Sequence, residues 1–247
     1  MARQLFIQVV NLERDTERMR MTADALSDIG LSFERLSAVI GADALNERQT
    51  STRQILGRDL YPGEVGCYLS HLKAIDRFLA TDAQYGLVLE DDAASISDTA
   101  DRLAALIEVL PRLPIWDVVN IGRSVKSEHT PVGSEYCSPD VGLCHAHYPP
   151  VTTTALLWSR GGARAFRLLH SQPVLPIDLA IQSWGAETDR ILALMRPIFV
   201  VREGESTIKG SGRRSGGHGL YSILARLRRI GWNKWRARYN RIRRRAV

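Results

Sequence analysis

Three consecutive carboxylates, Glu90, Asp91 and Asp92, directly follow the apolar run Leu87-Val88-Leu89. Adjacent carboxylates repel one another and are costly to bury without a cation. Carboxylate oxygens are the ligands that Mg²⁺ or Mn²⁺ prefers, with substrate phosphates and water completing the coordination. The triplet therefore indicates a divalent-metal site at the end of a strand. A solvated turn with a helix cap is the alternative, and the same triplet would also suit a phosphatase or a nuclease.

A second polar group follows the first apolar run of the chain. Residues 5–10 are typical of a short buried strand, and Asn11, Arg14 and Arg18 come after it. We expect these side chains to contact a nucleotide and its phosphates at a strand-end crevice, helped by the N-terminus of the next helix. A solvated helix face is the alternative for the two arginines.

The elements that position these residues alternate between strand and helix patterns. The strands are expected at residues 5–10, 33–39, 87–89, 118–122, 153–158 and 197–201, and the helices at residues 16–29, 64–79, 99–110 and 161–169. Residues 41–62 and 123–150 are expected to be irregular loops. The alternation predicts an α/β fold with a mostly parallel sheet, in which ligands bind at the carboxyl ends of the strands.

Composition restricts the class of protein. Of the 247 residues, 45% are hydrophobic and 24% are charged, which suits a folded domain and argues against wholesale disorder. The first apolar run is too short for a signal-peptide core, and the chain has no long uncharged apolar run. Three cysteines, Cys67, Cys137 and Cys144, form no disulfide framework and no zinc knuckle, so we expect a cytosolic location.

Several segments together resemble glycosyltransferase family 25, the lipopolysaccharide and lipooligosaccharide sugar transferases. The segments are Val10-Asn11-Leu12-Glu13-Arg14-Asp15-Thr16-Glu17-Arg18, Phe33-Glu34-Arg35-Leu36-Ser37-Ala38-Val39-Ile40-Gly41, Gly63-Glu64-Val65-Gly66-Cys67-Tyr68-Leu69-Ser70-His71-Leu72 and Leu87-Val88-Leu89-Glu90-Asp91-Asp92-Ala93, with weaker agreement at Trp116-Asp117-Val118, Pro176-Ile177-Asp178 and 197–208. The resemblance implies a GT-A type, Rossmann-like domain over residues 1–208 that binds a nucleotide sugar. It also implies inverting transfer of a hexose, most often galactose from UDP-galactose, onto a glycan acceptor such as lipopolysaccharide or lipooligosaccharide.

The resemblance assigns roles to individual residues. Asp92 is expected to bind Mn²⁺ or Mg²⁺ directly, Asp91 is the second metal ligand, and Glu90 is expected to accept a hydrogen bond from the ribose. Ser70 and His71 are expected in the donor site, although a histidine on such an apolar helix often belongs to the core. Asp178 is the expected general base, with Glu187, Asp189 and Asp117 as rivals, and a helix N-cap before residues 179–181 is the alternative role for Asp178. Weaker expectations concern Glu205 and Ser206 at the donor diphosphate and His218 at the metal.

The C-terminal segment has a different charge from the rest of the chain. Residues 209–247 hold 13 Lys or Arg and no acid, whereas residues 1–208 hold 20 basic and 27 acidic residues, a formal charge of −7. Leu220, Leu224, Leu227 and Ile230 have helical spacing among arginines, with tryptophans nearby. The pattern favours a basic amphipathic tail on an anionic membrane surface, at the inner face of the cytoplasmic membrane, over nucleic-acid binding. A non-catalytic, membrane-tethered nucleotide-sugar-binding protein of the same fold is the alternative to the enzyme.

Overall fold

The computed structural model describes residues 4–46, 58–202 and 220–245, and its centre is an eight-stranded sheet. From one edge to the other the strands are β2 (Glu34–Ser37), β1 (Leu5–Asn11), β3 (Tyr85–Glu90), β8 (Ala155–Ser159), β5 (Val118–Asn120), β9 (Ile191–Leu194), β7 (Leu143–Ala146) and β6 (His129–Pro131). Strands β2, β1, β3, β5, β9 and β6 share one direction, and only β8 and β7 oppose it. The expected α/β fold with a mostly parallel sheet is confirmed.

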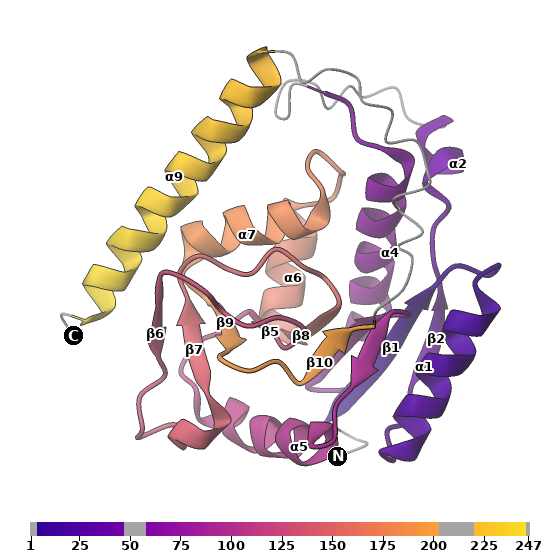
Figure 1. Ribbon diagram of the computed structural model, residues 1–247, viewed down its shortest axis with the longest axis horizontal. Coiled ribbons are helices and arrows are strands. Elements are labelled where there is room, and N and C mark those ends of the chain that lie inside the picture. Colours follow the sequence, from indigo (N-terminus) through magenta and orange to yellow (C-terminus); the bar gives the residue numbers. More distant parts are fainter. Residues whose placement is uncertain (1–3, 47–57, 203–219, 246–247) are drawn as a thin grey trace.

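Helices cover both faces of this sheet, which gives three layers (Figure 1). One face packs on α1 (Thr16–Asp28) and α5 (Thr99–Val109), and the other packs on α4 (Pro62–Leu79), α6 (Arg160–Leu169) and α7 (Ile177–Thr188). The alternation of side chains along a strand divides β8 between the two cores. Leu157 packs with the α1 and α5 side, whereas Leu156 and the fully buried Trp158 pack with α4, α6 and α7.

Most predicted elements exist within a few residues of their expected bounds, and five differences stand out. The expected loop 41–62 begins with a short helix, α2 (Gly41–Asn46), and the expected loop 123–150 contains β6 and β7. Strands β9 and β4 (Ala93–Ser95) were not predicted from the sequence. Strand β8 runs against its neighbours. The last predicted strand exists as β10 (Phe199–Val201), but it pairs with β4 in a separate small sheet. Strands of three or four residues carry too little periodicity to be recognised alone.

A long helix, α9 (Leu220–Arg245), follows the α/β core and packs on α7 (Figure 1). Among the described helices, none is apolar over enough residues to cross a bilayer. The boundary predicted between residues 208 and 209 lies outside the described residues, so the two-part division of the chain stays a prediction.

Two glycines allow α4 to approach the segment that follows β2. A Cβ on Gly66 would lie 2.6 Å from the carbonyl oxygen of Val39, and one on Gly41 would lie 1.7 Å from the carbonyl oxygen of Pro62. Neither backbone atom can move away cheaply. The close approach sets the N-terminal half of α4 beside the ends of β1 and β3.

We therefore expect Gly66→Ala to destabilise the protein by about 1–3 kcal/mol, because overpacking forces backbone shifts. Gly231 of α9 is the matched control, since a Cβ there meets no atom within 4 Å. Gly231→Ala should stabilise the protein by about 0.5–1 kcal/mol through helix propensity. Urea denaturation of both variants measures the two effects. Equal small effects from the two substitutions would contradict the close-packing account.

Candidate active site

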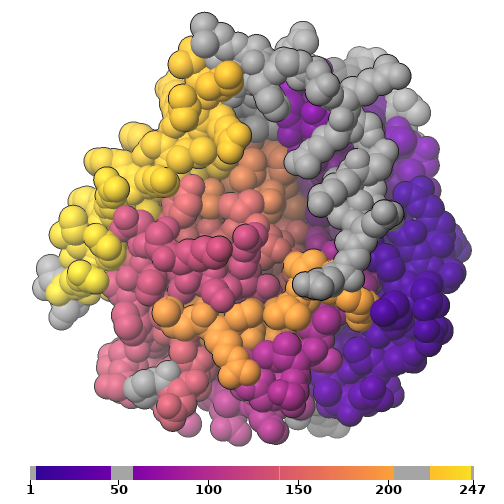
Figure 2. Space-filling model, viewed as in Figure 1, coloured from indigo at the N-terminus to yellow at the C-terminus, as the bar shows by residue number. Residues whose placement is uncertain are grey.

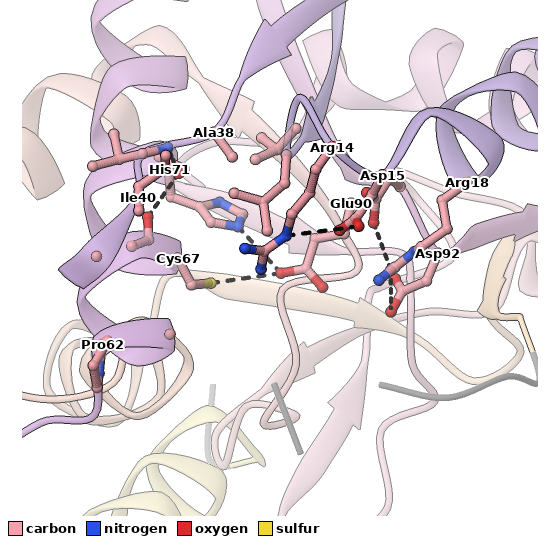
Figure 3. Close-up of a pocket in the computed structure, with 18 of the residues that line it drawn as sticks. Arg14, Asp15, Arg18, Ala38, Ile40, Pro62, Cys67, His71, Glu90 and Asp92 are labelled. Carbon is pink, nitrogen blue, oxygen red and sulfur yellow. Dashed lines mark hydrogen bonds and ion pairs between the residues drawn. The ribbon is translucent and has the colours of Figure 1, made fainter. Parts of the chain in front are cut away.

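A pocket of about 260 Å³ lies where β1 and β3 end, between α4 and the start of α1 (Figure 3). Its wall includes seven of the residues predicted from the sequence: Arg14, Arg18, Ser70, His71, Glu90, Asp91 and Asp92. Strands β1 and β3 are parallel neighbours, so their polar terminal residues meet at one edge of the sheet. The strand-end position expected for the acidic triplet is therefore what the structure shows.

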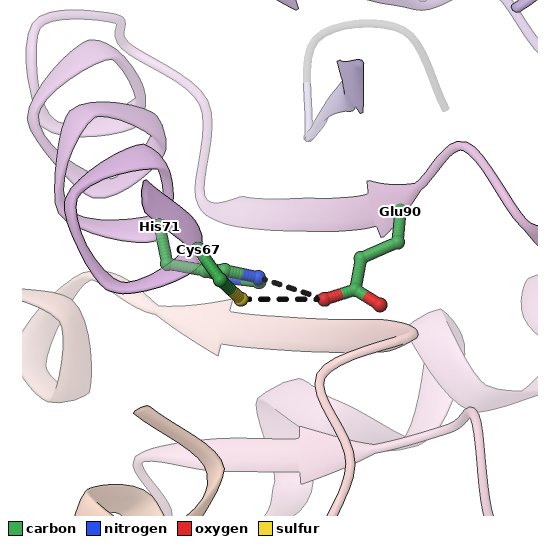
Figure 4. A group of neighbouring side chains, drawn as sticks. All are labelled: Cys67, His71 and Glu90. Carbon is green, nitrogen blue, oxygen red and sulfur yellow. Dashed lines mark hydrogen bonds and ion pairs between the residues drawn. The ribbon is translucent and has the colours of Figure 1, made fainter. Parts of the chain in front are cut away.

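Glu90 is the last residue of β3 and points toward α4 (Figure 4). Its Oε1 atom accepts a hydrogen bond of 2.6 Å from the hydroxyl of Thr153, and it lies 3.5 Å from Nε2 of His71 and 3.7 Å from Sγ of Cys67. Burial favours the neutral acid, but these hydrogen bonds and the charge of His71 outweigh burial and lower the pKa of Glu90. Glu90 is thus held as a carboxylate in the pocket wall.

Asp91 points to the opposite side of the strand end and is almost completely buried. One carboxylate oxygen accepts a hydrogen bond of 2.7 Å from Nδ2 of Asn11, and the other lies 2.5 Å from Nη2 of Arg18. Burial raises the pKa of Asp91 although these two partners oppose the shift. Because protein groups already hold both oxygens, Asp91 is less available to a metal than a carboxylate with an unpartnered oxygen.

Asp92 has the least satisfied carboxylate of the triplet. Its Oδ2 atom lies 3.4 Å from Arg18, while Oδ1 is buried without a hydrogen-bond partner in the described part of the chain. Burial, and then the neighbouring charge of Glu90, raise the pKa of Asp92 to about 6. A buried carboxylate oxygen with no donor and a raised pKa are what a divalent cation would correct. The residues present therefore fit the expected Mn²⁺ or Mg²⁺.

The side chains of Asn11 and Ser70 form hydrogen bonds with other parts of the protein that are not predicted from the sequence. The side-chain amide of Asn11 donates to Asp91 and to the backbone of Asp15, and its oxygen accepts from Arg35. The hydroxyl of Ser70 donates to the carbonyl of Gly66 and accepts from the backbone N–H of Val39. Both side chains shape the pocket by holding its walls together.

Arg14 and Arg18 differ in how firmly they are held. The Arg14 side chain is 70% exposed and lies 3.9 Å from the carboxylate of Asp15, so it can move toward a bound anion. Arg18 is only 26% exposed and forms ion pairs with both Asp91 and Asp92, and Figure 3 shows it beside Asp92. His71 is 1% exposed on the apolar helix α4, yet its Nε2 atom faces Glu90 and the pocket. It is both a core residue and a pocket residue.

Asp178 lies in the first turn of α7, and its carboxylate accepts a hydrogen bond from the N–H of Leu179. Burial raises its pKa most, and the charges of Glu90 and Glu64 add to the shift. The pKa of the Cys67 thiol is raised, first by burial and then by the charges of Glu90 and Asp178. Asp178 is therefore electrostatically coupled to the Glu90 wall, although it is not among the residues that line the pocket.

The rival acids lie elsewhere. Asp117 precedes β5 and so lies at the amino end of that strand, opposite to the carboxyl ends. Glu187 is exposed near the far end of α7, and Asp189 ends that helix with its carboxylate 2.6 Å from Nδ1 of His147. Glu205, Ser206 and His218 lie outside the described residues. The position of Asp178 agrees best with a base near the pocket.

Two residues were not proposed for the site from the sequence: Cys67, which lines the pocket, and Thr153, which contacts Glu90 of the pocket wall. Cys67 was considered only as a free cysteine, although its spacing of four from His71 places both on one side of a helix. Thr153 follows a loop whose path the sequence does not reveal, and only the structure brings its hydroxyl to Glu90.

Comparisons with known proteins identify relatives of this chain. Residues 4–110, which include β1, α4 and the acidic triplet, match the family model described as Glycosyltransferase family 25 (LPS biosynthesis protein). An inactive glycosyltransferase 25 family member 3 of Homo sapiens is 35% identical over 69% of this chain and 30% of its own length. Procollagen galactosyltransferase 1 of Danio rerio is 29% identical over 69% of this chain and 30% of its own length. The chain thus spans about a third of the curated relatives it matches.

Among solved structures, a glycosyltransferase involved in glycosylation of the major capsid of PBCV-1 superimposes with a TM-score of 0.46 and 10% identity, over 83% of this chain and 96% of that one. The sequence matches define the class of the protein as a glycosyltransferase relative. More closely, it belongs to glycosyltransferase family 25, as its motifs indicated.

The raised pKa of Asp92 predicts a pH-dependent stability in the absence of metal. The folded protein retains a proton between the ordinary value of 3.8 and about 6, whereas the unfolded chain releases it. The free energy of unfolding therefore falls as the pH rises through this window. At pH 7 Asp92→Asn should exceed the original protein in stability by about 1–2 kcal/mol, and near pH 4 the difference should vanish.

Chemical denaturation at both pH values in the presence of a chelator measures this difference. The exposed Asp82 supplies the control, because Asp82→Asn changes the same charge outside the pocket and should leave stability within about 0.5 kcal/mol at both pH values. A destabilised Asp92→Asn at pH 7 would show that the carboxylate is well accommodated without a cation.

Proposed function

We propose that the protein is a metal-dependent, inverting hexosyltransferase that moves galactose from UDP-galactose onto a glycan acceptor such as lipopolysaccharide or lipooligosaccharide. The observation that carries the proposal is the Asp92 carboxylate, which lies in the strand-end pocket with one oxygen buried and unpartnered. The name of the zebrafish relative supports galactose as the sugar.

The donor diphosphate would lie between the acidic and basic sides of the pocket. When Mn²⁺ or Mg²⁺ is bound at Asp92, it neutralises charge on the leaving diphosphate. Arg14 is exposed and can follow the phosphates, and Arg18 keeps Asp91 and Asp92 from repelling each other. The start of α1 beside them adds the partial positive charge of a helix N-terminus.

Asp178 is proposed as the general base on the acceptor side. In an inverting transfer the acceptor oxygen bonds to the anomeric carbon, the bond from that carbon to the phosphate oxygen breaks, and the acceptor proton passes to the base. The pKa of Asp178 is raised by burial and by Glu90 and Glu64, which makes its carboxylate a better proton acceptor than an exposed aspartate. UDP leaves with the electron pair of the broken bond.

A non-catalytic nucleotide-sugar-binding protein is the second candidate, because the human relative is named inactive. The two candidates share a pocket but differ in turnover. UDP binding without hydrolysis of any UDP-sugar would favour the second one.

Thermal stabilisation by UDP with Mn²⁺, and hydrolysis of UDP-galactose, test the enzyme directly. Asp92→Ala should abolish the manganese-dependent part of the stabilisation. Asp178→Asn should keep UDP binding and lose about 10²–10⁴-fold in hydrolysis rate, as expected for a lost base. The matched control is Glu187→Gln, an exposed acid on the same helix. An Asp92→Ala protein that responds to UDP and Mn²⁺ as before would remove Asp92 from the metal site.

We further propose that α9 attaches the enzyme to an anionic membrane at the cytoplasmic face, where a lipid-linked acceptor would be available. The inward side of α9 is polar or small. Asn233 donates to Ser183, Asn240 donates to the carbonyl of Ala186, and Ala237 is completely buried. These contacts dock the helix on α7 without using its large apolar residues.

The outward side of α9 carries those apolar residues. Seven of them are between 45% and 65% exposed: Ile223, Leu224, Leu227, Trp232, Trp235, Tyr239 and Ile242. Trp235 stacks on both Trp232 and Tyr239, with ring centroids 5.2 Å and 6.2 Å away. Figure 2 shows α9 (yellow) along one edge of the molecule. Aromatic and aliphatic groups among arginines suit the boundary between lipid headgroups and acyl chains.

Sedimentation with vesicles tests the membrane contact. Binding to vesicles of phosphatidylglycerol and phosphatidylcholine should weaken at least about tenfold in the double variant Trp232→Ala/Trp235→Ala, because two interfacial anchors are lost. Leu168 and Leu169 of α6 are also exposed, at 83% and 66%, so Leu168→Ala/Leu169→Ala is the control that should bind as before. Unchanged vesicle binding in the tryptophan variant, or stronger binding to nucleic acid than to vesicles, would overturn the proposal.

A further inference from the structure

Three side chains with different metal-binding atoms meet on the α4 side of the pocket (Figure 4). Cys67 and His71 are four residues apart on α4, so their side chains lie one above the other on one face of the helix. Glu90 approaches them from the end of β3. Sγ of Cys67, Nε2 of His71 and a carboxylate oxygen of Glu90 all lie within 4.8 Å of one another.

The chemistry of this set differs from that of the Asp92 site. A thiolate, an imidazole and a carboxylate are the ligands of Zn²⁺ and related cations, whereas Mg²⁺ prefers oxygen alone. We propose that Cys67, His71 and Glu90 form a binding site for a thiophilic divalent cation such as Zn²⁺, separate from the metal expected at Asp92. This site does not depend on the proposed sugar transfer.

Burial and accessibility of the three residues suit such a cation. The His71 side chain is 1% exposed and is therefore fixed by packing, whereas the Glu90 side chain is 26% exposed and borders the pocket. A cation can enter from the pocket and retain a water molecule or a substrate oxygen as its fourth ligand. Three protein ligands with one open position are the usual arrangement of zinc sites that contact substrates.

The surroundings of the ligands also support the site. The hydroxyl of Thr153 donates to Glu90 at 2.6 Å and so orients the carboxylate toward α4, a role that outer residues commonly play around metals. As the metal–sulfur bond forms, the thiol releases its proton to water, and thiolate plus carboxylate balance the two positive charges. Arg18 lies on the Asp91 and Asp92 side, where it makes its ion pairs.

Co²⁺ titration of the full chain tests the proposal, because Co²⁺ reports its ligands in its absorption spectrum. We expect a cobalt–thiolate charge-transfer band and the visible bands of four-coordinate Co²⁺, both removed by one equivalent of Zn²⁺. Cys67→Ser should abolish the thiolate band, and Glu90→Gln should weaken Co²⁺ binding at least about tenfold. Cys144→Ser is the control, because Cys144 is buried on β7 outside the pocket, and its spectrum should not change.

Absence of a thiolate band, or a band that persists in Cys67→Ser, would overturn the site and show that the three side chains only hydrogen-bond to one another. UDP binding with Mg²⁺ is measured on the same proteins. A protein that binds UDP but gives no cobalt–thiolate band refutes this inference alone. A cobalt–thiolate band without UDP binding refutes the proposed function alone.

Discussion

The placement of three adjacent carboxylates at one strand end is the constraint on which the rest of the site depends. Successive residues of an extended chain point in opposite directions, so Glu90 faces α4 and Asp91 faces the start of α1. Each carboxylate then meets a different set of donors: His71 and Thr153 for Glu90, Asn11 and Arg18 for Asp91. Asp92 comes last and has the fewest partners, which leaves it for a ligand.

Because each carboxylate needs its own partners, the residues around the triplet come from segments that are far apart in the sequence. Asn11 lies 80 residues before Asp91, yet parallel pairing of β1 with β3 brings the two together. Ser70 and the glycine at position 66 hold α4 against the segment after β2, which brings His71 to the same place. Several residues predicted to contact a substrate therefore support the position of Asp92, whose Oδ1 atom has no hydrogen-bond partner in the described part of the chain.

The sequence was sufficient for the class of fold and for the position of the acidic triplet, because the alternation of strand and helix patterns and the polar residues that follow short apolar runs are local signals. It could not reveal that the side chains of Asn11 and Ser70 form hydrogen bonds within the protein, because Asp91 and Val39, their respective partners, belong to distant segments. The choice of Asp178 over Asp189, two acids at opposite ends of α7, came from the family resemblance and not from a local pattern. In α9, Ile230 turns partly inward while Trp232, Trp235 and Tyr239 complete the exposed face, because contacts with α7 decide which side is covered.

The reversed direction of β8 has a consequence for how this scaffold can diversify. Because β8 runs against β3, its beginning lies beside the end of β3, and the connection that enters β8 contacts Glu90 of the pocket wall through Thr153. Its residues, including Thr153, are anchored by a backbone hydrogen bond from Glu90 to Thr154. Insertions and substitutions in this connection can reshape the surroundings of Glu90 while the buried strand and both cores stay intact, so it offers related enzymes a place to acquire new selectivity.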